Sequence, residues 1–202
     1  MISGVVLAGG KSSRMGRPKA LLPIGTSGDT FLDRVTRTLH DAGVHDLLVV
    51  VGADAESIKS EARFSPRTRF VVNPDYELGQ LTSLVAALRQ IDPTTVTGAL
   101  ITLIDVPLVS TETVRKLIAA HDSGMASIVR PVSNGRHGHP VIFHSRLFDE
   151  LCRADPARGA KVVVRAHEHE IHEVPVDDEG AFIDIDTREE YERWIGPLPG
   201  LH

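Results

Sequence analysis

A glycine-rich loop with four cations occupies residues 7–19 and directly follows an apolar segment. Its adjacent glycines, Gly9 and Gly10, carry no Cβ, so the backbone can approach a ligand closely and its N–H groups can cradle phosphate oxygens. The four cations are Lys11, Arg14, Arg17 and Lys19, with no acidic residue among them. Because the whole chain has a formal net charge of −5, this local reversal of charge indicates an anion site. We therefore predict that the loop binds phosphate; the alternative is an ordinary surface turn.

The glycine spacing of this loop fits neither of two common nucleotide motifs. A Walker A loop ending at Lys11-Ser12 needs a glycine where this chain has Val5, and the dinucleotide-binding glycine pattern is absent as well. The sequence therefore argues against a P-loop kinase or ATPase.

Two aspartate segments offer oxygen ligands for a metal. Asp105 follows the apolar run of residues 98–104, and Pro107 ends that run. Asp184 and Asp186 flank Ile185, and the alternation of an extended segment places both carboxylates on one face. Magnesium prefers oxygen ligands and usually takes one or two carboxylates together with substrate phosphate. A carboxylate from each segment would suit Mg²⁺; the alternative is that these aspartates cap the helices that follow.

The elements that must position these residues alternate regularly along the chain. Short apolar runs predict buried strands, and runs with helical spacing follow them. The predicted strands are residues 2–8, 47–52, 70–73 and 98–104, and the predicted helices lie around residues 31–39, 81–91 and 114–118. In the first helix, Thr30 and Asp33 are placed as a capping box and Gly43 as the C-terminal stop. Such alternation specifies a largely parallel sheet with helices on both faces, whose strands end at one edge. The glycine loop and Asp105 should meet at that edge.

The pattern loosens after Gly124. Strands are expected at residues 126–132, 140–143, 173–176 and 181–185, and helices at 147–153 and 160–167. We expect this last third to add edge strands to the same sheet.

Length and composition set outer limits on the function. The 202 residues, 42% hydrophobic and 24% charged, fit one folded domain spanning residues 1–202. A net charge of −5 gives no general attraction for nucleic acid, and a single cysteine, Cys152, excludes an internal disulfide. No apolar stretch approaches the roughly 18 residues of a membrane span, so a membrane is not expected as a partner. Because of the net charge, nucleic acid is not expected as a partner either, and the expected location is the cytoplasm. The histidines of residues 167–172 have no further ligands at zinc spacing and are not expected to bind metal.

The order of the motifs resembles a known family. The loop of residues 7–19, continued by Leu21-Leu22-Pro23, resembles the signature of nucleotidyltransferases. The molybdopterin nucleotidyltransferases of the NTP transferase type share four more segments in the same order: Asn73-Pro74 with Gly79 and Ser83-Leu84, Asp105-Val106-Pro107, Gly138-His139-Pro140-Val141, and Asp184-Ile185-Asp186-Thr187. The set spans residues 5–190. It is most similar to the molybdenum cofactor cytidylyltransferase branch, whose near relatives are the guanylyltransferases.

This resemblance implies a fold and a reaction. The fold would be a Rossmann-like three-layer α/β/α sandwich of the glycosyltransferase A type. The reaction would be Mg²⁺-dependent transfer of CMP from CTP to molybdopterin or the molybdenum cofactor, with release of pyrophosphate. A recipient molybdoenzyme is an implied partner. Alternatives are GMP transfer from GTP, a sugar phosphate or other small phosphorylated acceptor, and a nucleotide- or cofactor-binding module without turnover.

The resemblance also assigns roles to residues. It makes Asp105 the first metal ligand and Asp186 the second, with Asp184 as the alternative. We take Arg14 and Lys19 as the catalytic cations, because the acceptor phosphate is already an anion and catalysis needs charge stabilisation rather than a base. The nucleotide-binding candidates are Leu7, Ala8, Gly9, Gly10, Ser12, Ser13, Asn73, Gly79 and Ser83, and the acceptor-side candidates are His139 with Arg136 and His137. The form Leu7-Ala8-Gly9-Gly10 is the more usual one in guanylyltransferases, whereas the later segments favour the cytidylyl branch.

Overall fold

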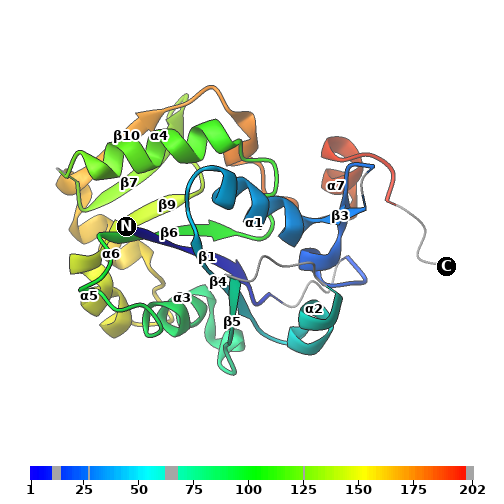
Figure 1. Cartoon of the computed structure of the whole chain (residues 1–202), viewed down its shortest axis with the longest axis horizontal. Coiled ribbons are helices and arrows are strands. Elements are labelled where there is room, and N and C mark those ends of the chain that lie inside the picture. Colours follow the sequence, from blue (N-terminus) through cyan, green and yellow to red (C-terminus); the bar gives the residue numbers. More distant parts are fainter. Residues whose placement is uncertain (11–14, 27, 62–67, 125, 199–202) are drawn as a thin grey trace.

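A mixed eight-stranded sheet forms the centre of the chain in the computed structural model, which describes residues 1–10, 15–26, 28–61, 68–124 and 126–198 (Figure 1). Four strands are parallel: β1 (Ile2–Ala8), β4 (Asp46–Val51), β5 (Thr68–Val72) and β6 (Gly98–Leu103), in the order β6-β1-β4-β5. In this register Val5 lies between Leu48 and Ile101. The predicted strands of the first half are therefore confirmed.

The second half of the chain extends the sheet from β6. The strand β9 (Val141–His144) pairs antiparallel with β6 and with β7 (Ile128–Ser133), and β10 (Ile171–Pro175) pairs parallel with β7. A short strand, β8 (Arg136–His137), folds back on β7. The strands β2 (Pro23–Ile24) and β3 (Asp29–Thr30) form a separate small sheet.

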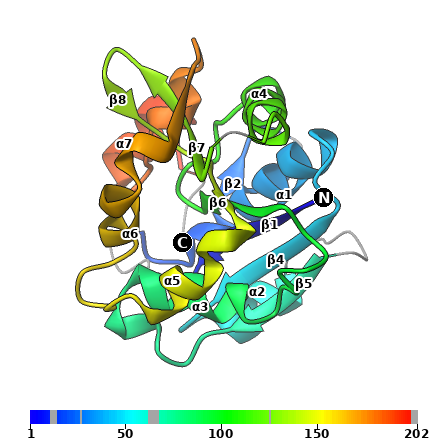
Figure 2. The same cartoon turned by 90° about the vertical axis from the view of Figure 1, so that its left-hand side faces the viewer.

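Helices cover both faces of the sheet (Figure 1 and Figure 2). One face packs against α1 (Phe31–Asp41) and α4 (Thr111–Asp122), and the other against α3 (Gln80–Leu88), α5 (Phe148–Arg153) and α6 (Lys161–Ala166). Alternate residues of β1 enter opposite cores, Val6 with α1 and Val5 with α3, and both side chains are completely buried. Each contributes about 1.5 to 3 kcal/mol of burial free energy. The three-layer α/β/α arrangement expected from the sequence is confirmed.

Local signals in the sequence explain where the helices begin and end. Thr30 and Asp33 form the expected capping box at the start of α1. After α1 the chain turns at Gly43, whose φ of 99° is a left-handed conformation that favours glycine. Ser110 caps α4 by accepting a hydrogen bond from the Thr113 N–H. The helices α2 (Ala55–Glu61) and α7 (Arg188–Trp194) lie toward the end of the molecule where β1 and β4 finish (Figure 1).

The expected strand at residues 181–185 is wrong. Residues Glu179–Phe182 form a 3-10 turn, and the chain then crosses the carboxyl edge of the sheet. Its backbone groups bond to that edge rather than to a neighbouring strand, since the Ala181 carbonyl accepts from the His139 N–H at 2.8 Å and the Ile185 N–H donates to the Asp105 carbonyl at 2.8 Å. Among the described residues, no helix is long and apolar enough to cross a membrane.

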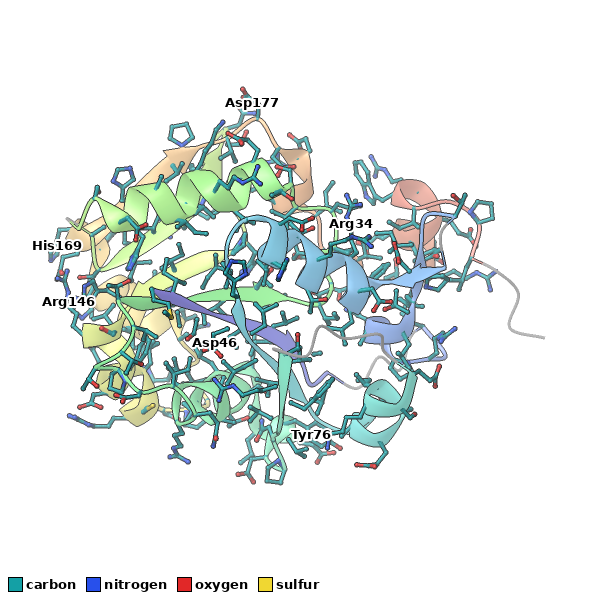
Figure 3. The ribbon with its side chains drawn as sticks, viewed as in Figure 1. Arg34, Asp46, Tyr76, Arg146, His169 and Asp177 are labelled. Atoms are coloured by element: carbon teal, nitrogen blue, oxygen red, sulfur yellow. The ribbon has the colours of Figure 1, made fainter. Side chains whose placement is uncertain are left out.

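A polar cluster ties β7 and β10 to α5 and α6 at the end of the molecule opposite α7. Ser127 donates to Glu170, which also accepts from Arg146 at 3.0 Å. His167 bridges Glu170 at 2.9 Å and Glu150 at 2.8 Å. Arg146 is seen at this end in Figure 3. The hydrogen bond from Ser127, followed by that from His167, lowers the pKa of Glu170 to about 2, and the bonds to Glu170 and Glu150 raise the pKa of His167.

Glu170→Gln is expected to lower the melting temperature most near pH 5.5. The stabilisation by Glu170 is present above its ordinary pKa of 4.5 and is lost as the pH falls toward 2. The stabilisation by His167 is present below its ordinary pKa of 6.5 and is lost as the pH rises through its raised value. Thermal melts at about pH 5.5 and 8.5 measure the difference, with Glu168→Gln, an exposed neighbour, as the control. An equal loss at both pH values would contradict the coupling of Glu170 to His167.

Candidate functional site

The carboxyl edge of the parallel strands brings the ends of β1, β4 and β6 together, as the sequence predicts. Gly9 follows β1, Gly52 follows β4, and Asp105 comes shortly after β6. Gly52 was not singled out from the sequence, yet a Cβ there would lie 2.5 Å from the Gly9 carbonyl oxygen and 2.7 Å from Cγ of Tyr76. Only glycine allows this close approach, which sets the glycine loop against the residues that follow β5.

Lys19 lies between two carboxylates at this edge. Its Nζ is 3.0 Å from Oδ2 of Asp105 and also contacts Oδ1 of Asp186. These partners are 86 and 167 residues further along the chain, so the fold alone assembles the group. Burial lowers the pKa of Lys19, but the hydrogen bonds and charges of Asp186 and Asp105 outweigh burial and raise the pKa above 10.5. The ammonium of Lys19 is therefore permanently protonated at neutral pH.

The segment that carries Asp186 is fastened on both sides. The Ile185 N–H bonds to the Asp105 carbonyl, and the Glu190 carboxylate accepts from the N–H groups of Asp186 at 2.8 Å and Thr187 at 2.9 Å. Thr187, not Asp186, is the N-cap of α7. The Asp186 side chain is thereby directed at Lys19 rather than used to cap the helix. Glu190 is a positioning residue that sequence reasoning missed.

A third carboxylate, Asp184, adds negative charge to the group. Burial, followed by the negative charge of Asp105, raises the pKa of Asp184 above its ordinary value. Like charges disfavour one another at such a site unless a cation is present. A cation bound near these carboxylates would relieve the repulsion between them.

The donor set at this edge fits Mg²⁺. Oδ1 of Asp105 is buried and has no hydrogen-bond partner within the described part of the chain, so it offers an unused anionic oxygen. Across those same residues, no three acidic, histidine or cysteine side chains form a ready-made metal site. Two carboxylates completed by water and substrate phosphate are the usual arrangement for Mg²⁺, and Asp105 and Asp186 could supply them.

The turn between β5 and α3 is held by its own polar side chains. Asn73 donates to Oγ1 of Thr82 at 2.9 Å and to Oγ of Ser83 at 3.0 Å, and its Oδ1 accepts from the Asp75 N–H at 3.0 Å. Gly79, with φ of 113°, precedes α3. The structure therefore brings the sequence-predicted residues Asn73, Gly79 and Ser83 together, with Asn73 and Ser83 bonded to each other.

Gly9 lies against this turn. A Cβ at Gly9 would be 3.2 Å from Oγ of Ser83 and 3.7 Å from Cβ of Tyr76, whereas a Cβ at Gly10 would meet no described atom within 4 Å. The glycine loop and the β5–α3 turn are thus two adjoining walls. Leu7 and Ala8 are buried at the end of β1. Ser12, Ser13 and Arg14, with Lys11, lie outside the described residues.

A cavity of about 360 Å³ opens between α3, α6 and the strands β6, β7 and β9. Its walls are mainly aliphatic, including Leu81, Leu84, Ile101, Val141 and Val164, and its polar lining comes from Gln80, Arg130, His137, His139 and Lys161. Nδ1 of His139 is buried without a partner among the residues described, and burial lowers the pKa of this histidine. The predicted acceptor residues His137 and His139 line this cavity.

Arg136 does not line the cavity. It pairs with Glu179 at 2.7 Å and lies over the Phe182 ring. Conversely, Gln80, Arg130 and Lys161 were not anticipated. No local motif marks these three, because only the packing of α3 and α6 over the sheet brings them together.

Comparison with known proteins finds a matching family model and relatives that cover most of the chain. Residues 4–171 match the model of the MobA-like NTP transferase domain. The chain is 31% identical to nicotine blue oxidoreductase of Paenarthrobacter nicotinovorans over 96% of both chains, and 29% identical to the molybdenum cofactor guanylyltransferase of Cupriavidus metallidurans over 94% of this chain and 92% of that one. It superimposes on the crystal structure of Rv0371c from Mycobacterium tuberculosis H37Rv with a TM-score of 0.83 at 32% identity, covering 96% of each chain.

Proposed function

This chain belongs to the MobA-like NTP transferase family and is a nucleotidyltransferase, and from that premise we propose that it transfers CMP from CTP to the terminal phosphate of molybdopterin or the molybdenum cofactor. Pyrophosphate is the second product, and Mg²⁺ is required. The observation that supports this most is the group formed by Lys19, Asp105 and Asp186 at the carboxyl edge of the sheet. That group contains a permanently charged ammonium, which can bind phosphate, and two carboxylates, which can bind a metal.

The chemistry needs no general base. The acceptor phosphate is an anion near neutral pH, so its oxygen attacks the α-phosphorus directly, the new O–P bond forms, and the bond to pyrophosphate breaks with its electron pair on the leaving group. Asp105 and Asp186 would hold Mg²⁺, which supplies neutralisation of the phosphate charge. Lys19 contributes a positive charge near the phosphate oxygens of the nucleotide. Because Gly9 and Gly10 have no side chain, their backbone N–H groups can approach these phosphates closely.

The cavity beside the carboxylates supports a heterocyclic acceptor. The aliphatic side chains of α3 and of β6 and β9 suit the faces of a flat ring system, and Gln80 in the cavity lining offers hydrogen bonds to the pterin edge. Lys161 lines the same cavity and suits an anionic acceptor, whereas Arg130 in that lining is paired with Glu173. Binding there would place the acceptor phosphate toward Asp105.

The direct test is to incubate the protein with Mg²⁺, molybdopterin and each of CTP, GTP, ATP and UTP, and to measure pyrophosphate. Release that needs both CTP and molybdopterin supports the proposal. Release with a sugar phosphate in place of molybdopterin would move the acceptor to that class. Nucleotide binding without any pyrophosphate would identify a binding module.

GMP transfer from GTP is the second candidate, favoured by Gly9 and by the similarity to a guanylyltransferase. We expect a preference for CTP in the wild type. Gly9→Ala is expected to sharpen that preference about tenfold, because the added methyl fills space between the loop and Ser83 that the larger base needs. Competition between CTP and GTP, measured as the ratio of their kcat/KM values, checks both statements.

Gly10→Ala is the matched control for this comparison, since its Cβ would meet no described atom within 4 Å. It should leave the CTP to GTP ratio unchanged. A wild-type preference for GTP would overturn the assignment of the base, and an unchanged ratio in Gly9→Ala would remove Gly9 from the specificity argument.

A redox reaction is a third candidate, favoured by the similarity to a protein named nicotine blue oxidoreductase and by the aliphatic walls of the cavity. Following NADH or NADPH absorbance with an apolar heteroaromatic substrate tests it. Nicotinamide oxidation that is insensitive to Asp105→Asn would favour this reaction over nucleotidyl transfer.

A further inference from the structure

We propose that Lys19 occupies the metal position when no nucleotide is bound, so that its ammonium must leave Asp105 and Asp186 before a divalent metal can bind. The inference rests on the proposed function in one respect, namely that these two carboxylates are the metal ligands. It adds a role for Lys19 before catalysis, in setting when the metal binds.

The contacts of Lys19 carry this inference. Its Nζ contacts an oxygen of each carboxylate, and its side chain is only 14% exposed. A metal held by both Asp105 and Asp186 would have to lie between these two carboxylates, which is where the ammonium of Lys19 lies. Two cations between the same two carboxylates repel each other strongly, so Lys19 has to move away when a metal binds there.

The surrounding backbone allows the side chain to move while its Cα stays in place. Lys19 begins the 3-10 turn Lys19–Leu21, and the Leu21 and Leu22 N–H groups bond back to the Pro18 and Lys19 carbonyls. The residues that follow Lys19 are buried in the core. The four-carbon stem of lysine carries a mobile point charge, which can turn from the carboxylates to the triphosphate.

The consequence is cooperative binding of metal and nucleotide. Without nucleotide, a metal must displace the ammonium of Lys19 from its contacts with Asp105 and Asp186. With nucleotide, the phosphates replace those partners. Because coupling between two ligands is reciprocal, the metal also tightens nucleotide binding.

Manganese binding without nucleotide tests the proposal in the full-length protein. Titration calorimetry or the EPR signal of free Mn²⁺ gives the dissociation constant for wild type and variants. Lys19→Ala is expected to bind Mn²⁺ about tenfold more tightly than wild type. Lys19→Arg keeps the charge between the carboxylates and should not bind more tightly. Arg17→Ala removes a cation that pairs with Glu61 instead, and should equal wild type.

Chemical accessibility gives a second readout that does not depend on affinity. We expect saturating Mn²⁺ to increase the acetylation rate of Lys19, measured by mass spectrometry, because the displaced ammonium becomes exposed. The exposed Lys116 on α4 is the internal reference and should react at an unchanged rate.

The outcomes separate this inference from the proposed function. Equal or weaker Mn²⁺ binding in Lys19→Ala, or an acetylation rate of Lys19 that Mn²⁺ leaves unchanged, would overturn the displacement of Lys19. If Asp105→Asn binds Mn²⁺ as tightly as wild type, the metal site itself is wrong and the proposed function fails with it. Tightening in Arg17→Ala equal to that in Lys19→Ala would show a general charge effect and also overturn the inference.

Discussion

Asp105→Asn is expected to lower kcat/KM by about 10³-fold or more, while the melting temperature changes by less than about 4 °C. The substitution keeps the volume of the side chain and removes the charge that would hold Mg²⁺. Lys19 retains its contact with Asp186, and the backbone bond from Ile185 to the Asp105 carbonyl is unaffected. Steady-state kinetics and thermal melts on the same preparation give both quantities.

The small effect on stability has a physical reason. Asp105 raises the pKa of Asp184, second to burial, which means that the two carboxylates repel each other in the folded protein. Removing one charge relieves that repulsion and offsets the lost bond to Lys19. A residue that contributes little to folding but is placed among like charges is more consistent with a functional role than with a structural one.

Asp46→Asn is the matched control. Asp46 also bonds to a cation, Arg69, at 2.9 Å, but it begins β4 and therefore lies at the opposite edge of the sheet (Figure 3). Its loss should leave kcat/KM unchanged. If Asp105→Asn turns over normally, or unfolds where Asp46→Asn does not, the metal role of Asp105 is wrong.

Lys19→Ala is expected to lower kcat/KM by raising its activation free energy by about 2 to 4 kcal/mol, which is the loss typical of removing one charge-stabilising donor from a transition state. Negative charge spreads over the equatorial and leaving oxygens during transfer, and the methyl group of alanine cannot compensate for it. The loss should appear mainly in kcat. Because the same variant should bind Mn²⁺ more tightly, metal affinity and turnover are expected to change in opposite directions.

Variants of the other cations of the loop serve as comparisons for Lys19→Ala. Arg17 pairs with Glu61 at 3.6 Å and is partly exposed, so Arg17→Ala should leave kcat/KM close to wild type. The activation free energy is expected to rise as much in Arg14→Ala as in Lys19→Ala. In Lys11→Ala it should rise by less than a tenth of that amount. Small and equal losses in all four variants would show that the loop is not the triphosphate site.

Much of the fold follows from local signals in the sequence. The apolar strands, the Thr30–Asp33 capping box and the turn at Gly43 appear where the pattern indicates them, because each depends on neighbouring residues. The group of Lys19, Asp105 and Asp186 could also be anticipated in part. A strand ends before Asp105, and parallel strands finish at one edge, which fixes where these side chains must gather.

The remaining features depend on contacts between distant segments. The antiparallel direction of β9 is set by its pairing with both β6 and β7, and the chain at residues 181–185 has alternating apolar residues although its bonds go to a sheet edge. Glu190 was missed because its partner is the backbone of Asp186 rather than a side chain of the motif. Gly52 is marked only by the approach of Tyr76 and Gly9.

The fastening of Asp186 to the end of β6 has a consequence for how the protein becomes active during synthesis. Lys19 and Asp186 are 167 residues apart, and the segment that carries Asp186 is anchored by Ile185 and by Glu190 in α7. The ribosome must therefore have synthesised the chain through Glu190 before both carboxylates can face Lys19. The parallel strands β1, β4, β5 and β6 are synthesised earlier, so this part of the sheet can form before Asp186 is in place to contact Lys19.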